Sequence, residues 1–251
     1  MKAALPNMLA RTLRGFLAVY LPGVRGASPH TVRSYRDALV LVLRFLADQK
    51  GRSVIDLDFK DFDPASVLAF LAHLESRREN CTSTRNARLA AIHSFARYVA
   101  SQHPDALEQC QRLLAIPFKR GYQRAVEYLE VEEIQAMLEA TDRRTPDGRR
   151  DHALLLLLFN TGARVQELLD IRPQDLQLKR PCLVRLLGKG RKERLCPLWP
   201  QTAEILGALL DQTGLDPASS HRLFRNRRGE PLSRFGVAYL LRKYAKLAQT
   251  V

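Results

Sequence analysis

Cysteine is scarce in this sequence, and the four that are present are spread along the chain: Cys81, Cys110, Cys182 and Cys196. None has the Cys-x-x-Cys spacing of a zinc site and nothing suggests a disulfide framework, so we expect reduced structural thiols. The six histidines are equally dispersed, and no two of them have metal-ligand spacing. The sequence therefore predicts no metal site and no cofactor.

Long apolar runs are also missing. Residues 153–159 are seven apolar residues in a row, which is far too short to span a bilayer. The N-terminal MKAALPNMLARTLRGFLAVYL lacks the sustained apolar core and the small-residue cleavage site of a signal peptide. We therefore expect a cytoplasmic protein.

Acidic residues are few relative to basic ones. The chain has 26 Asp and Glu against 40 Lys and Arg, which gives a formal charge of +14 and a pI of about 10.1. This balance predicts a polyanionic partner, nucleic acid first and an anionic membrane surface second. At 251 residues and 46% hydrophobic content, the chain is long enough for one large domain or two ordinary ones.

The N-terminal part has the pattern of four or five helices. Ser28-Pro29 predicts a helix to about residue 49, and Asp63-Pro64 predicts a second one. Thr82 or Ser83 is expected to cap a third, whose apolar positions keep helical spacing to about residue 99. These helices predict an all-helical domain over residues 1–112.

A polar, basic segment that includes FKRGYQRAV then interrupts the helical pattern, and predicts a linker over residues 113–126. In the second domain, residues 127–251, we expect helices near 130–141, from about 150, after Arg164, at 200–212 and at 233–249. Between them, residues 182–187 and 193–198 read as two strands of a β-hairpin around GKGRK. The predicted fold class is mainly α with a small β-hairpin or sheet.

TGARVQELL, residues 161–169, places an arginine where the first turn of a helix is expected. A cation there is disfavoured by the helix dipole, so something anionic must offset the charge of Arg164. Glu167, three residues on, is one candidate, as an i,i+3 ion pair; a bound phosphate is the other. The two can coexist.

In LLGKGRKERLCPL, Lys189 lies between two glycines, so the backbone of this turn can approach a large ligand closely. By itself the stretch favours a solvated hairpin tip, since lysine and glycine are ordinary turn residues. Together with Arg164 and the charge of the whole chain, it favours contact with a nucleic-acid backbone.

NTGARVQELLDIRPQDLQL followed by LLGKGRKERLCPL strongly resembles the tyrosine recombinases, the phage-integrase and Xer-like enzymes that break and rejoin DNA through a phosphotyrosyl intermediate. LFRNRRGEPLSRFGVAYLLRKYAKLA, residues 223–248, resembles the segment before the second catalytic box of that family. The resemblance covers nearly the whole chain. It implies a helical, SAM-like core-binding domain followed by part of a catalytic domain, with double-stranded DNA as the partner and a nucleoid-associated location.

The resemblance also implies roles for single residues. Arg164 is similar to the arginine that holds the scissile phosphate, and Glu167 to the acidic residue that orients it. Lys189 is similar to the hairpin lysine that protonates the leaving 5′ oxygen, with Lys192 as the alternative. Further DNA contacts are expected from eight basic residues, of which each can instead be a solvated surface charge: Arg33, Arg36, Arg85, Arg88, Lys119, Arg120, Arg191 and Arg194.

The His-x-x-Arg box and the nucleophilic tyrosine of the family do not follow residue 248. HRLFR at His221 does not match that box, and Tyr239 and Tyr244 are expected to be packing residues. The sequence therefore predicts a recombinase or integrase, truncated before its second box and inactive alone, that joins intact protomers in a DNA-bound tetramer. The alternative is a non-catalytic duplex-DNA-binding module at recombination sites. A general RNA-binding protein is disfavoured, because no RNA-binding motif or stacking platform is recognisable.

Overall fold

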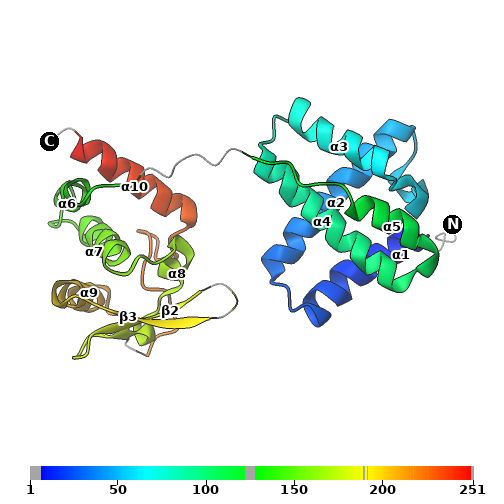
Figure 1. The fold of residues 1–251 in the computed structure, drawn as a ribbon. Helices are drawn as coiled ribbons and strands as arrows, with labels where there is room; N and C mark the ends of the chain where they lie inside the picture. The colour runs from blue at the N-terminus through cyan, green and yellow to red at the C-terminus, as the bar shows by residue number, and fades with distance from the viewer. Residues whose placement is uncertain (1–6, 122–127, 189, 191, 217, 250–251) are drawn as a thin grey trace. The chain divides into compact units, whose positions relative to one another are not determined.

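The computed structural model describes residues 7–121, 128–188, 190, 192–216 and 218–249, and it divides into two compact units, Met1–Ala125 and Val126–Val251. Figure 1 shows helices throughout both units and one small sheet, which belongs to the second. The expected fold class is therefore confirmed. Each unit has a hydrophobic core of its own.

The first unit is all-helical in its described residues. Its helices are α1 (Met8–Gly15), the π-helical η1 (Phe16–Val24), α2 (Pro29–Lys50), α3 (Pro64–Ser76), α4 (Thr82–Gln102) and α5 (Leu107–Leu114), with short 3₁₀ turns at Val54–Asp56, Phe59–Asp61 and Pro104–Ala106. The core is filled by aromatic and aliphatic side chains, including Phe16, Phe70 and Phe95 of these helices and Phe62, which lies just before α3.

Two of the predicted caps are confirmed. The Ser28 side chain accepts from the backbone N–H of Thr31, and that of Asp63 accepts from Ser66. Because proline lacks an N–H and prefers helical φ, it is well suited to the position that follows each cap. The cap of α4 was expected at Thr82 or Ser83 and lies earlier: the helix begins at Thr82, and the residue before it is Cys81.

The second unit contains α6 (Val131–Glu139), α7 (Pro146–Thr161), α8 (Val165–Asp170), α9 (Pro200–Thr213) and α10 (Arg234–Ala248). The helix expected from about residue 150 begins four residues earlier, because the Thr145 side chain accepts from the Gly148 N–H and caps it. A short 3₁₀ turn, Pro173–Asp175, follows α8 and leads into the sheet.

The sheet has three antiparallel strands in the order β1-β2-β3: β1 (Leu176–Gln177), β2 (Leu183–Leu187) and β3 (Glu193–Pro197). The predicted hairpin is β2 and β3, with Leu187 opposite Glu193 and Leu183 opposite Pro197. Strand β1 was not expected. Val184 and Leu186 of β2 point into the core, so the other face of this strand is exposed.

Candidate functional site

The last residues of α7, with Gly162 directly after them, position Arg164. Gly162 has φ +57°, a left-handed conformation that glycine adopts without strain, and its N–H donates to the carbonyl of Leu158. The Thr161 hydroxyl accepts from the Ala163 N–H. Arg164 then has extended backbone angles and occupies the N-cap position of α8 without a side-chain capping bond, so it precedes the first turn in which it was expected.

Glu167 is the anion that faces Arg164. Its Oε2 accepts from the Arg164 backbone N–H at 3.0 Å, and its Oε1 from the Arg164 guanidinium at 2.8 Å. The Glu167 side chain is 4% exposed, whereas that of Arg164 is 73% exposed. The predicted i,i+3 pair therefore exists, and it fixes one edge of a guanidinium whose remaining donors face solvent.

Strand β3 brings a second arginine to the same carboxylate. Arg194 donates to Glu167 Oε2 at 2.7 Å, and its side chain is 38% exposed. Gly188, directly after β2, allows this close approach, because a Cβ atom on it would lie 3.0 Å from Glu167 Oε1. Arg164, Glu167 and Arg194 were each named as candidates from the sequence. The contact between Arg194 and Glu167 was not predicted, because it joins residues far apart in the chain.

The carboxyl of Glu167 is strongly acidic in this setting. The hydrogen bond from Arg194 has the largest effect, and with the bonds from Arg164 it lowers the pKa of Glu167 to about 2, although burial opposes the shift. The site thus holds two cations and one anion that stays ionised throughout the neutral range.

The hairpin tip is described only in part. Lys189 and Arg191 lie outside the described residues. The Gly188 N–H donates to the Lys192 carbonyl at 2.8 Å, which closes the hairpin, and the Lys192 side chain is exposed.

Three of the basic residues expected in the first unit are exposed or partly exposed. Arg33 and Arg36 are exposed on α2, and Arg36 pairs with the adjacent Asp37. Arg88 of α4 is half-buried and donates weakly to the Ser34 carbonyl at 3.5 Å. These side chains come from two neighbouring helices of one unit.

Arg85 differs from this expectation. Its side chain is buried, and its guanidinium donates to Asn86 Oδ1 at 3.0 Å and to the Pro117 carbonyl at 3.4 Å. Asn86 in turn exchanges two hydrogen bonds with the backbone of Lys119. Arg85 therefore holds the segment after α5 against α4 instead of facing solvent.

Lys119 and Arg120, which were expected in the linker, are both exposed. The Lys119 ammonium lies 2.7 Å from a carboxylate oxygen of Glu75 on α3, so part of its charge is already offset.

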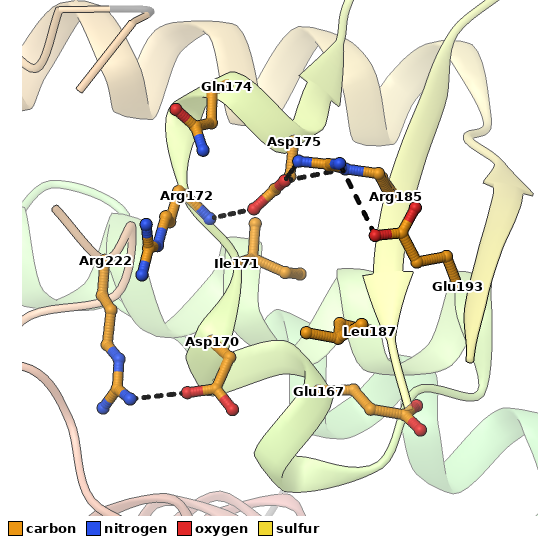
Figure 2. A pocket seen from close by; sticks show the side chains of 10 residues that line it. All are labelled: Glu167, Asp170, Ile171, Arg172, Gln174, Asp175, Arg185, Leu187, Glu193 and Arg222. Atoms are coloured by element: carbon orange, nitrogen blue, oxygen red, sulfur yellow. Dashed lines mark hydrogen bonds and ion pairs between the residues drawn. The ribbon is translucent and has the colours of Figure 1, made fainter. Parts of the chain in front are cut away.

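A cavity of about 310 Å³ lies beside Glu167, between α8, the 3₁₀ turn and the sheet (Figure 2). Arg185 of β2 pairs with Asp175 at 2.6 Å, and Arg222 pairs with Asp170 at 2.6 Å. These cations already have carboxylate partners, so the cavity holds ion pairs beside the Glu167 carboxylate. Apart from Glu167, the residues that line it were not named as site residues from the sequence.

The two tyrosines of α10 have different surroundings. Tyr244 is 2% exposed, and its hydroxyl donates to Asp151 Oδ2 at 2.8 Å; burial raises its pKa. The packing role expected for Tyr244 is therefore confirmed. Tyr239 is 65% exposed, so the packing role expected for it was wrong.

The described residues contain no cluster of three or more potential metal ligands. Within the same part of the chain, none of the helices combines the length and the apolar character that crossing a lipid bilayer requires.

Comparison with known families and proteins gives matches over nearly the whole chain. Residues 13–103 match the model of the phage integrase N-terminal SAM-like domain, and residues 127–251 match that of the phage integrase family. The putative integrase/recombinase y4rD of Sinorhizobium fredii is 40% identical over 245 residues, or 97% of this chain and 87% of that protein. The tyrosine recombinase XerC of Herpetosiphon aurantiacus is 33% identical, over 95% of this chain and 76% of its own.

Solved structures share the fold. The XerH site-specific recombinase bound to a palindromic difH substrate superposes with a TM-score of 0.68 and 21% identity, over 90% of this chain and 65% of that one. A lambda integrase dimer bound to a COC′ core site gives a TM-score of 0.67 at 15% identity, over 96% of this chain and 63% of that one.

Proposed function

Because this chain belongs to the phage integrase family of tyrosine recombinases, we propose that it serves site-specific DNA recombination by binding duplex DNA, and that Arg164 holds the phosphate of the strand to be cut. The observation that carries this proposal is the pairing of Arg164 with Glu167: one edge of the guanidinium is fixed and the rest is exposed. A guanidinium fork matches two phosphate oxygens, and fixing its direction in advance strengthens the contact.

In this proposal, three parts of the chain have different roles in binding DNA. Residues 1–112 form a helical clamp that contacts DNA through Arg33, Arg36 and Arg88. Arg85 instead holds the segment after α5 against α4. The linker, which was expected over residues 113–126, begins only after α5 ends at Leu114, and in this proposal Lys119 and Arg120 lie along the DNA backbone. Residues 127–251 supply the phosphate site, with Lys189 as general acid, Arg191 as a further backbone contact and Arg194 as a support of Glu167.

Partners of this chain are proposed from its relatives. Related proteins have been solved on DNA, among them a lambda integrase tetramer bound to a Holliday junction. We propose duplex DNA as the ligand here, with other recombinase protomers as partners in a DNA-bound tetramer.

A second candidate is a non-catalytic module that occupies recombination sites. Tyr244 supports it, because this hydroxyl is buried and engaged with Asp151, which leaves it unable to attack a phosphate. In this form of the proposal, residues 1–251 bind DNA through Arg164 but do not cleave it alone.

DNA binding is tested with duplexes enriched from a random-sequence pool by the 251-residue chain, followed by gel-shift titration of Arg164→Ala and Arg164→Lys. We expect both variants to bind less tightly, by roughly tenfold for alanine and less for lysine, which keeps the charge but loses the fork. The matched control is Arg143→Ala, which removes an exposed arginine of the same unit. Equal losses for Arg143→Ala and Arg164→Ala would contradict a specific phosphate site.

Cleavage is tested with nicked duplexes of the enriched sequence, which trap a phosphotyrosyl intermediate. A protein–DNA adduct that survives denaturation supports the recombinase and removes the non-catalytic module. Tight binding without an adduct supports the module.

A further inference from the structure

The segment that follows α5 returns along α4 of the first unit (Figure 1). The Phe118 ring lies edge-on to the ring of His93, with their centroids 5.3 Å apart. Gly121 lies close to Thr82 at the start of α4, since a Cβ atom on this glycine would be 3.4 Å from Thr82 Cγ2. Residues 117–121 are therefore held against the helix by specific contacts.

Lys119 is fixed within this segment by its backbone. Asn86 Nδ2 donates to the Lys119 carbonyl at 2.8 Å, and the Lys119 N–H donates to Asn86 Oδ1 at 3.1 Å. One amide side chain thus satisfies both backbone groups of one residue, as a neighbouring strand does in a sheet. Arg85 also donates to Asn86 Oδ1, at 3.0 Å. Because a flipped amide would turn its NH₂ group toward two donors, the hydrogen bonds determine the direction of this side chain.

The Lys119 side chain extends from this anchored backbone and is 55% exposed. Its ammonium lies 2.7 Å from Glu75 Oε1 of α3, a carboxylate that is itself partly exposed. An exposed ion pair of this kind contributes little to stability, because water competes for both groups. A phosphate can therefore replace the Glu75 carboxylate at little cost, and this exchange leaves both hydrogen bonds between Asn86 and the Lys119 backbone in place.

On the basis of the function proposed above, in which Lys119 contacts DNA, we propose that Asn86 is a positioning residue: it presents the Lys119 ammonium to one phosphate, which displaces Glu75. The anchor acts before binding. Since the backbone of Lys119 is already fixed, only its side chain has to be ordered when DNA binds. A phosphate contact carries no sequence information, so the anchor contributes to affinity and register but not to the choice of bases.

The anchor is tested first without DNA, by amide hydrogen exchange of the 251-residue chain measured by NMR. We expect the Lys119 amide to be protected in wild type and to exchange at the rate of an unprotected amide in Asn86→Ala. Asn80→Ala is the matched control, because the Asn80 side chain also donates to a backbone carbonyl, that of Arg78 at 3.0 Å, outside this segment. Rapid exchange at Lys119 in wild type, or continued protection in Asn86→Ala, would overturn the inference.

Binding is then measured with duplexes that the chain enriches from a random-sequence pool. We expect Asn86→Ala to bind about tenfold more weakly, the cost of ordering the backbone of one residue during binding. Asn80→Ala binds as wild type does. Glu75→Gln removes the competing carboxylate, so it binds about threefold more tightly, in line with the small contribution of an exposed ion pair.

The coupling between Asn86 and Lys119 is the readout that a merely structural role would not move. We expect Lys119→Ala to weaken wild-type binding roughly tenfold or more, as the loss of a hydrogen bond to a charged group does. In the Asn86→Ala background the same change costs less than about threefold, because the unanchored lysine has already lost most of its contribution. Glu75→Gln likewise tightens binding in wild type and has little effect in Asn86→Ala.

The outcomes separate this inference from the function on which it rests. If wild type enriches no duplex, the proposed function fails and the inference fails with it, even where the Lys119 amide is protected. If wild type binds DNA but Lys119→Ala has the same effect in both backgrounds, the inference alone is overturned. Weaker binding by Glu75→Gln would also overturn it, because the carboxylate would then support DNA binding instead of competing with the phosphate.

Discussion

Arg194 and Glu167 are separated by 27 residues, yet a guanidinium nitrogen of one lies 2.7 Å from a carboxylate oxygen of the other. The contact joins strand β3 to α8, and it leaves Glu167 between two arginines. Because Glu167 also fixes Arg164, any movement of the hairpin is transmitted to the arginine proposed to hold phosphate.

Replacing Arg194 by alanine removes one partner from a buried carboxylate. We expect the free energy of unfolding to fall by about 1–3 kcal/mol, less than for a fully buried pair because Arg194 is partly solvated. DNA binding weakens in parallel because Arg164 loses its orientation. Arg194→Lys restores part of both, which urea titration and gel shift would show. A variant with normal stability and weak binding would instead indicate direct contact between Arg194 and DNA.

Acid should weaken the second unit through Glu167. A carboxyl whose pKa is lowered from 4.5 to about 2 by folding contributes stability that is complete above pH 4.5 and is lost as the pH falls toward 2. This contribution is on the order of 3 kcal/mol, from 1.36 kcal/mol per pKa unit. Urea unfolding between pH 2.5 and 6 checks it. In Glu167→Gln this part of the pH dependence disappears; an unchanged profile would show that other carboxyls cause it.

Gly188→Ala tests the closeness of the hairpin to α8. The new Cβ would lie 3.0 Å from Glu167 Oε1 and 3.5 Å from the Lys192 carbonyl, so the carboxylate or the strand must shift. We expect a loss of about 1–3 kcal/mol in stability, the usual cost of overpacking, together with weaker DNA binding. Gly207→Ala, whose Cβ would meet only an ordinary contact at 3.8 Å, is the control. Equal effects of the two changes would contradict the tight approach.

Tyr244→Phe removes the hydroxyl that donates to Asp151. Because this leaves a buried carboxylate oxygen without one of its donors, we expect a loss of about 1–3 kcal/mol by thermal or urea unfolding. Tyr239→Phe on the same helix changes stability by less than about 0.5 kcal/mol, since its side chain is exposed. A small effect at Tyr244 would mean that water replaces the lost donor.

His152 should remain neutral in the folded protein. Its Nδ1 lies 2.9 Å from Thr141 Oγ1 and 3.1 Å from the Leu138 carbonyl, whereas Nε2 is buried without a partner among the described residues. Burial lowers its pKa below 6.5, so its contribution to stability is complete above pH 6.5 and declines as the pH falls below it. Imidazole NMR titration measures this directly; titration at or above 6.5 would contradict it.

Local signals made most of the fold predictable. Serine or aspartate followed by proline located two helix starts, because both residue types act within one turn of the chain. Cys81 was missed as the residue before α4 because a thiol is not a typical cap. Strand β1 was missed because two residues carry no detectable alternation.

The candidate site was only partly predictable. Arg164 and Glu167 are three residues apart, so their pairing follows from helical spacing, whereas the contact of Arg194 with Glu167 depends on how the hairpin folds back. Burial of Arg85 and exposure of Tyr239 depend in the same way on tertiary packing, and the opposite was predicted for both from local patterns.

The net charge of Arg164, Arg194 and Glu167 predicts how many counterions leave the DNA when it binds at this cluster. Arg164 and Arg194 carry two positive charges and Glu167 one negative charge, so the cluster has one positive charge in excess, which equals the charge of a single phosphodiester. Binding at this cluster should release about one condensed counterion from the DNA. A plot of log K against log salt concentration has a negative slope. We expect this slope to become shallower by about 0.9 in Arg164→Ala, and steeper by a similar amount in Glu167→Gln, where the excess charge becomes two.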